Sequence, residues 1–210
     1  MNNLIIIPAR KNSIRLKNKN ILKLKKLTLI EHTINFAKKV MLNSNILVST
    51  DSQKIRSISL KNKVLCPWLR PNYLSKSNSS TEAVIIHALK WYEKRYGRVD
   101  LIVLCQPTSP FRTEKSYYNC ISLAKKYPKS TIITFKEKKI ITYTYLNSEI
   151  KMKKKIITVP NGNLFIISSK KLKKKKQLYS GSIKPYLIKN NKENIDIDNE
   201  EDFVLAKKLY

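Results

Sequence analysis

Short apolar runs rich in β-branched residues alternate along most of this chain with segments whose apolar residues recur at helical spacing. The clearest runs are residues 4–7 (LIII) and 101–105 (LIVLC), and the clearest helical segments are residues 29–41 and 81–96. Such alternation is typical of βαβ units, in which helices cover a sheet of parallel strands. It predicts an α/β fold of Rossmann-like type, with an open, mostly parallel sheet flanked by helices.

The second half of the chain interrupts this pattern at residues 136–160. Its strand-like pieces, 140–146 and 156–159, are separated by a charged connection, which indicates a small β-hairpin that protrudes from the sheet. Thr28 is expected to cap the helix that follows it. The remaining predicted strands lie at residues 46–49, near 64–65, and at 131–135, 163–167 and 185–189, and the remaining helices begin at Ser52 and span 114–126 and 199–209.

Length and composition suit one domain over residues 1–210, with 42% hydrophobic residues available for a core. Three glycines are too few for a GxGxxG or Walker phosphate loop. Cys66, Cys105 and Cys120 lie irregularly among apolar neighbours and are expected to be reduced core residues. No apolar stretch approaches the roughly 18 to 20 residues of a membrane span, and the first apolar run is too short for a signal peptide. We therefore expect a cytoplasmic protein with no membrane partner.

The net charge of +29 would ordinarily suggest a polyanionic partner. Only seven of the 43 basic residues are arginines, and heavy joint use of lysine, isoleucine and asparagine is expected from an AT-rich genome. The lysine runs at 151–155 and 170–176 lack interleaved aromatic residues that could stack on bases. They are interpreted as solvated turns or helix faces, and nucleic acid is not expected as a partner.

A polar loop follows the first predicted strand. Residues 7–21 (IPARKNSIRLKNKNI) carry Arg10, Arg15 and Lys19 together with polar donors such as Ser13. Ligands of open α/β sheets bind at the carboxyl ends of the strands, where such cations could grip a polyphosphate. The alternative is a solvated, lysine-rich surface loop, which charge alone would favour in so basic a chain.

Two aspartates near the C-terminus alternate with isoleucines in the sequence IDID. Asp196 and Asp198 would point to one side of an extended strand, and paired carboxylates suit magnesium. A solvated face of an edge strand is the alternative. Asp51 immediately precedes a helix, so an N-cap is at least as good an interpretation as catalysis. His32 and His87 are interpreted as partly buried, hydrogen-bonded structural histidines rather than as catalytic residues.

Six motifs follow one another along the chain and together cover nearly all of it. They are IPAR-x-x-S-x-R-L-x-x-K-N-I at 7–21, LVSTD at 47–51, Arg70-Pro71 with VIIHAL at 84–89, QPTSPFR at 106–112, PNGNLF at 160–165 and IDIDNEEDF at 195–203. In this order they resemble the motifs of the acylneuraminate cytidylyltransferase (CMP-sialic acid synthetase) family, and the first is similar to that family's nucleotide-binding signature.

The resemblance implies transfer of CMP from CTP to the anomeric hydroxyl of a sialic-acid-like 2-keto acid sugar, with release of pyrophosphate and dependence on Mg2+. Arg10, Lys19 and Asp198 would be catalytic. The implied substrate contacts are Arg10, Ser13 and Lys19 for CTP, Asn20 and the Ala9 backbone near cytosine or ribose, Arg70, Ser80 and Thr81 around the nucleoside, and Gln106, Thr108 and Ser109 on the sugar side. Asp196 and Asp198 would bind the magnesium ion.

The chain departs from the family at a few positions. Val159 stands where the family usually has an arginine or similar polar group, and Ser77 replaces a common aspartate. The insertion 136–160 is short, and in the family this region helps to form a homodimer, which we expect here. Two alternatives stay open. One is a 3-deoxy-manno-octulosonate cytidylyltransferase, against which QPTSP at 106–110 argues, and the other is a catalytically weakened relative that binds polyanions.

Overall fold

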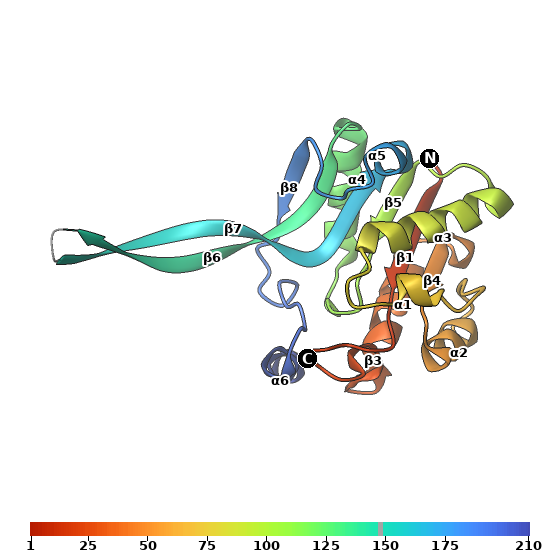
Figure 1. Cartoon of the computed structure of the whole chain (residues 1–210), viewed down its shortest axis with the longest axis horizontal. Coiled ribbons are helices and arrows are strands. Elements are labelled where there is room, and N and C mark those ends of the chain that lie inside the picture. The colour runs from red at the N-terminus through yellow and green to blue at the C-terminus, as the bar shows by residue number, and fades with distance from the viewer. Residues whose placement is uncertain (147–148) are drawn as a thin grey trace.

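The apolar runs form one six-stranded sheet in the computed structural model of this chain, which describes residues 1–146 and 149–210 (Figure 1). Its strands are β1 (Asn3–Pro8), β4 (Ile46–Ser49), β5 (Leu101–Leu104), β6 (Thr131–Leu146), β7 (Glu149–Ser168) and β8 (Ile183–Leu187). The order is β4-β1-β5-β7-β6-β8. β1 is parallel to β4 and β5, and β8 is parallel to β6, whereas β7 runs antiparallel to both neighbours. The prediction of a mostly parallel α/β sheet is confirmed.

Helices cover both faces of this sheet. They are α1 (Leu29–Val40), α2 (Gln53–Lys61), α3 (Thr81–Tyr96), α4 (Glu114–Lys126) and α5 (Ser169–Lys175), and a sixth helix, α6 (Glu200–Leu209), lies apart from the sheet. Alternate residues of a strand face opposite sides, so Ile5 and Ile7 of β1 pack with residues of α1, α2 and α4. Leu4 and Ile6 pack with residues of α3 and α5 on the other face. A third, smaller core joins α6 to the loop after β1.

Short elements complete the chain between these layers. They are a two-stranded hairpin of β2 (Lys23–Leu24) and β3 (Leu27–Thr28), and the 3-10 turns η1 (Lys19–Ile21), η2 (Asn43–Asn45) and η3 (Asn72–Leu74). The strand expected near residues 64–65 is a single bridge between Leu47 and Leu65. The three cysteines are buried and free, as predicted. Within the described residues, no helix has both the length and the apolar character needed to cross a membrane.

Two cap predictions have different outcomes. Thr28 caps α1 through a capping box, in which its hydroxyl oxygen accepts the Glu31 N–H and the Glu31 carboxylate accepts the Thr28 N–H at 2.8 Å. For α2 the cap is Ser52, whose oxygen accepts the Ile55 N–H at 3.3 Å. The N-cap interpretation of Asp51 is therefore wrong, because the helix begins one residue later than that interpretation needs.

The protruding hairpin is larger than the sequence suggests. β6 and β7 stay paired from Phe135 and Pro160 out to Leu146 and Glu149, which makes an arm of about 35 Å at 3.4 Å per residue. It projects from the body of the molecule (Figure 1). Lysines 151–155 belong to β7, so their interpretation as a turn or helix face is wrong. Residues 147 and 148, part of the expected charged connection, lie outside the described residues.

The acidic segment 195–198 is not a strand. It is irregular chain after β8, with the Ile197 N–H donating to the carbonyl of Thr108 at 2.8 Å. Alternation nevertheless holds, because Ile195 and Ile197 are buried in the third core. Anchored isoleucines thus leave Asp196 and Asp198 to face the opposite side, without a sheet partner.

Candidate active site

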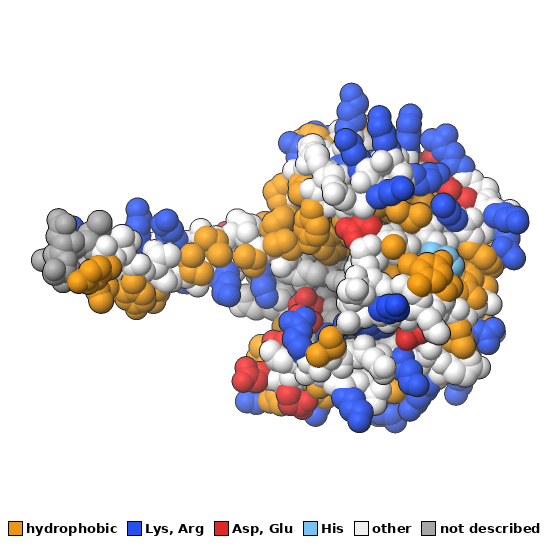
Figure 2. Space-filling model, in the orientation of Figure 1, with side chains coloured by type: hydrophobic (Ala, Val, Ile, Leu, Met, Phe, Trp, Pro, Cys, Tyr) orange, Lys and Arg blue, Asp and Glu red, His pale blue; other side chains and the backbone are white. Residues whose placement is uncertain are grey.

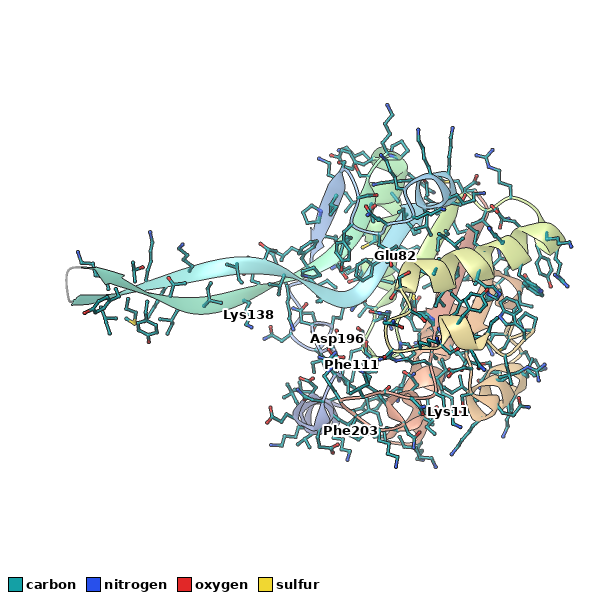
Figure 3. All side chains as sticks on the ribbon, in the orientation of Figure 1. Lys11, Glu82, Phe111, Lys138, Asp196 and Phe203 are labelled. Atoms are coloured by element: carbon teal, nitrogen blue, oxygen red, sulfur yellow. The ribbon has the colours of Figure 1, made fainter. Side chains whose placement is uncertain are left out.

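A cavity of about 720 Å³ lies at the carboxyl ends of β1 and β5. Its walls come from four segments: the loop after β1, the stretch between β4 and α3, the loop after β5, and the acidic segment before α6. In the view of Figure 3, Asp196 lies between α6 and the foot of the arm. Ten of the thirteen residues to which the resemblance assigns a role in the site line this cavity, namely Arg10, Ser13, Lys19, Asn20, Arg70, Thr81, Gln106, Thr108, Asp196 and Asp198.

Three other residues named from the sequence do not line the cavity. Ala9 is fully buried in the core. Ser80 is exposed and caps α3, with its side-chain oxygen accepting the Ala83 N–H at 3.2 Å. Ser109 is buried, and its backbone carbonyl accepts a hydrogen bond from Arg112.

Hydrogen bonds hold the loop after β1 in the wall of the cavity. The side-chain amide of Asn20 donates to the carbonyl of Arg10 at 2.9 Å, which closes the loop on itself. Lys19 is buried, and its Nζ donates to Oδ1 of Asp198 at 2.9 Å. Arg10 reaches the opposite wall, where its Nη1 donates to the carbonyl of Ser77 at 3.4 Å. Two cations therefore enter one cavity from a single short loop.

Arg70 forms a second cationic feature at the wall between β4 and α3. Its side chain is only 4% exposed, with Nη2 3.5 Å from Oδ1 of Asp51. Burial lowers the pKa of Arg70, and the Asp51 carboxylate opposes that shift. Asp51 also accepts the Lys11 N–H at 2.7 Å. Among the described residues, Nε of Arg70 has no hydrogen-bond partner, and Nη2 has only its ion pair with Asp51.

The two aspartates of the acidic segment have different surroundings. Burial raises the pKa of Asp196; the Thr108 hydroxyl opposes the shift, and the nearby Asp198 carboxylate adds to it. Oδ1 of Asp196 is buried and has no hydrogen-bond partner among the described residues. Asp198 is paired with Lys19 at 2.9 Å and with Arg15 at 2.8 Å.

Gly162 makes room for this carboxylate. A Cβ on Gly162 would lie 2.7 Å from Oδ2 of Asp196, closer than side chains tolerate, and the residue has φ +72°. Both observations explain why glycine, rather than a residue with a side chain, follows Asn161 in PNGNLF. Within the described residues no group of three or more His, Cys, Asp or Glu side chains forms a metal cluster. A cation here would need ligand oxygens in addition to the two aspartates.

Sequence reasoning missed the polar residues that hold the acidic segment in place. The buried Glu193 carboxylate accepts hydroxyls from Thr113 at 3.0 Å and Ser116 at 2.7 Å, at the N-terminus of α4. Asn161 and Asn163 of β7 donate their side-chain amides to Asn194 and Glu193. The repeated asparagines of PNGN were the available signal, because buried amides need partners.

Neither histidine lines the cavity. His32 is buried with Nε2 2.9 Å from the carbonyl of Leu24, as expected for a structural histidine. His87 stacks edge-on against Trp68 at 5.2 Å, and burial lowers its pKa, with Arg70 adding to the effect. Its Nδ1 has no partner among the described residues, so the expectation of a hydrogen-bonded His87 is wrong for that atom.

Comparisons with known proteins agree with this geometry. The chain is 30% identical over 98% of its length to CMP-N,N'-diacetyllegionaminic acid synthase of Legionella pneumophila, covering 95% of that protein. It is 28% identical over 96% of its length to N-acylneuraminate cytidylyltransferase of Escherichia coli, of which it spans 50%. It shares its fold with a solved CMP:2-keto-3-deoxy-manno-octonic acid synthetase, at a TM-score of 0.70 and 14% identity, covering 100% of this chain and 98% of that one.

A family model described as Cytidylyltransferase matches residues 4–209, which is nearly the whole chain. The match spans every wall of the cavity, from the loop after β1 to the acidic segment before α6. The chain belongs to the cytidylyltransferase family.

Proposed function

We propose that this chain transfers CMP from CTP to the anomeric hydroxyl of a sialic-acid-like 2-keto acid sugar, with release of pyrophosphate. The observation that carries the proposal is the single cavity in which cations, neutral polar side chains and two carboxylates from four segments meet. Family membership supports the nucleotide. The names of the Legionella and E. coli relatives support the class of acceptor, and legionaminic acid derivatives are the first sugars to test.

The cations of the loop after β1 would bind the triphosphate. Arg10 and Lys19 both line the cavity, and charge-assisted hydrogen bonds to phosphate are among the stronger contacts available to a protein. Negative charge grows on the leaving pyrophosphate as its bond to the α-phosphorus breaks, and fixed cations stabilise that charge. Arg70 and Thr81, on the wall between β4 and α3, would contact the nucleoside together with Asn20.

Gln106 and Thr108 would hold the acceptor sugar. Both follow β5 and line the cavity, and side-chain amide and hydroxyl groups suit a polyhydroxylated acid. The anomeric hydroxyl would attack the α-phosphorus, so that a sugar–phosphorus oxygen bond forms while the bond to the β-phosphate breaks. The chain's own contribution is to orient the two substrates and to neutralise charge.

Asp196 and Asp198 would hold a magnesium ion. The donor set fits, because Oδ1 of Asp196 is buried without a partner among the described residues and carboxylate oxygens are ligands that Mg2+ prefers. When bound, the ion would neutralise phosphate charge and lower the pKa of the attacking hydroxyl. Two carboxylates leave the remaining ligand positions to phosphate oxygens and water.

A homodimer through the arm is part of the proposal. Residues directly opposite each other in an antiparallel pair share a face, and this register gives the arm two unlike faces. Tyr143 pairs with Met152 and Tyr145 with Ile150, whereas Thr142 pairs with Lys153. The same face carries Ile141 and Ile156, which lie directly opposite Lys154 and Lys139, and all six apolar side chains are at least 51% exposed. Figure 2 shows hydrophobic side chains along the arm.

Such an apolar face supports contact with a second copy of the chain. An isolated two-stranded hairpin is only marginally stable in water, and exposed apolar surface of this kind marks interaction sites. We name this surface the apolar arm face, comprising Ile141, Tyr143, Tyr145, Ile150, Met152 and Ile156. Its counterpart, the basic arm face, comprises Thr142, Thr144, Lys151, Lys153 and Lys155.

The proposal is tested by pyrophosphate release from CTP and Mg2+ with a panel of acids: legionaminic, sialic and pseudaminic acid derivatives and 3-deoxy-manno-octulosonate. Release with one nine-carbon acid, and none without an acceptor, is the expected result. Release with 3-deoxy-manno-octulosonate alone would favour the eight-carbon alternative. No release with any acid, together with tight binding of a polyanion such as heparin, would favour the weakened polyanion-binding relative.

A further inference from the structure

One arginine outside the cavity occupies an unusual position behind its sugar side. Arg112 ends the sequence QPTSPFR, and the residue is only 7% exposed. Its guanidinium donates to three backbone carbonyls at 2.6 Å each, from Nε to Asn163, from Nη1 to Ser109 and from Nη2 to Gln106. No carboxylate of the described residues lies within ion-pair distance of it.

A buried charge without an ion-pair partner is costly unless its hydrogen bonds are satisfied. Here the three carbonyls supply those bonds, together with the Thr33 hydroxyl at 3.5 Å from Nη1. A leucine or methionine would fill the same space without that cost. The fork geometry of arginine, with donors fixed in one plane, is what lets one side chain bind carbonyls of two separate segments.

Two of the carbonyls that Arg112 binds belong to the turn after β5, which contributes to the wall of the cavity. Gln106 and Ser109 are the ends of the turn after β5, in which the Ser109 N–H also donates to the carbonyl of Gln106 at 3.3 Å. Gln106 and Thr108, inside that turn, line the cavity. The third carbonyl, that of Asn163, lies on β7, so the guanidinium fixes the turn against the neighbouring strand.

The same turn supports the acidic segment. Thr108 accepts the Ile197 N–H at 2.8 Å, between the two aspartates. Asn163, whose carbonyl Arg112 binds, donates its side-chain amide to the carbonyl of Glu193 at 3.0 Å. Arg112 therefore lies where the turn after β5, β7 and the segment before α6 meet.

We propose that Arg112 is a positioning residue. It holds the 106–109 turn so that Gln106 and Thr108 face the acceptor sugar and keep their position relative to Asp196. The inference rests on the proposed function, because it explains how the sugar-binding turn of that site is held in place. Arg112 does not line the cavity. Its replacement should weaken use of the sugar and leave use of CTP nearly unchanged, because the nucleotide walls come from other segments.

The test measures steady-state kinetics with each substrate varied in turn for Arg112→Lys and Arg112→Gln, together with their unfolding temperatures. Lysine keeps the charge but has no planar fork, and glutamine keeps a planar amide without the charge. For both we expect the KM of the sugar to rise about tenfold or more while the KM of CTP stays within about twofold. Arg56→Lys is the matched control. Arg56 also donates from Nε to a backbone carbonyl, that of Cys66 at 3.3 Å, but it does not line the cavity and its partner lies outside the 106–109 turn.

A double-mutant comparison separates positioning from general destabilisation. If Arg112 acts through Gln106, then Arg112→Lys should raise the sugar KM much less in a Gln106→Ala background than in the wild type. Equal increases in both backgrounds, equal effects on the sugar and CTP constants, or failure of both Arg112 variants to fold would overturn the proposal. If the wild-type chain uses none of the acids, the proposed function is wrong, and this inference falls with it.

Discussion

Asp198 carries the largest expected consequence of any single side chain in the site. It is paired with Lys19 and Arg15 and lines the cavity. Asp198→Asn keeps the shape but removes the charge, so turnover should fall below detection while the unfolding temperature changes little. Asp196→Asn should be milder in turnover if that carboxylate reaches the metal through water. Kinetics with varied Mg2+ check both, and near-normal activity of both variants would contradict the metal assignment.

Arg10 and Lys19 are expected to act locally, through contacts with phosphate. Each should make a charge-assisted contact in a partly desolvated cavity, so Arg10→Ala and Lys19→Ala should each lose about 1.5 to 3 kcal/mol of transition-state stabilisation. The measurement is kcat/KM for CTP at physiological salt.

Lysines of α5 provide the control for that prediction. Lys174 and Lys175 are exposed and do not line the cavity. Changing both to glutamine removes as much charge as the two site variants together, and kcat/KM should stay within about twofold. A comparable loss from both sets would mean that the general positive field, rather than the loop after β1, governs nucleotide binding.

Gln106 is expected to distinguish the two substrates. It precedes Pro107, which biases it towards an extended conformation over the cavity. Gln106→Ala should raise the KM of the sugar by an amount typical of one or two neutral hydrogen bonds, about 0.5 to 3 kcal/mol, with little change in the KM of CTP. If the CTP constant rises and the sugar constant does not, the 106–109 turn lies on the nucleotide side of the site.

At the scale of elements, the arm formed by β6 and β7 makes the clearest prediction. Tyr143→Lys and Met152→Lys place charges on the apolar arm face, at two residues that lie directly opposite each other. Each should raise the dimer dissociation constant at least about tenfold, because buried aromatic and aliphatic anchors dominate interface energies. Sedimentation velocity across a dilution series measures the effect.

Thr142→Lys is the matched control for the arm. Thr142 neighbours Tyr143 in sequence but lies on the basic arm face, opposite Lys153. The control should leave the dissociation constant nearly unchanged. A wild-type chain that sediments as a monomer at all concentrations, or equal effects of the variants on both faces, would refute association through the apolar arm face.

The same elements show what sequence can and cannot predict. Strands β1 and β5 were evident because they are buried on both faces and therefore continuously apolar. Residues 149–155 of β7 were missed because Lys154 lies on the same face as Met152 and interrupts the alternation, so that residues 153–155 read as a charged run. The acidic segment was predicted to alternate, and does, but its partners are the core and the carbonyl of Thr108 rather than a neighbouring strand.

Residues that support the site from behind were the hardest to predict. Arg112, Glu193 and Gly162 act through contacts with segments far away in sequence, such as Asn163, which lies 51 residues from Arg112. A single sequence does not show which residues form such pairs. Its only signal is a polar residue within or next to an apolar stretch, such as the asparagines of PNGN. By contrast, cavity-lining residues of the loop after β1 were predictable, because strand polarity alone fixes where that loop must lie.

For the whole molecule, the surface charge and the site are separate features. Lys and Arg side chains are spread over the visible surface (Figure 2), whereas the cavity combines cations with two carboxylates. This spread favours the interpretation of the +29 charge as a property of composition. The proposed function is one reaction at this one cavity.

The most direct measurement of that reaction is 31P NMR of CTP and Mg2+ incubated with the wild-type chain and the preferred acid from the panel. We expect the three CTP resonances to be replaced by one phosphodiester signal, from CMP joined to the sugar, and by pyrophosphate in equal molar amount, with no change when the acid is left out. Formation of CDP and inorganic phosphate, or of pyrophosphate with free CMP and no phosphodiester, would contradict transfer of CMP to the anomeric hydroxyl.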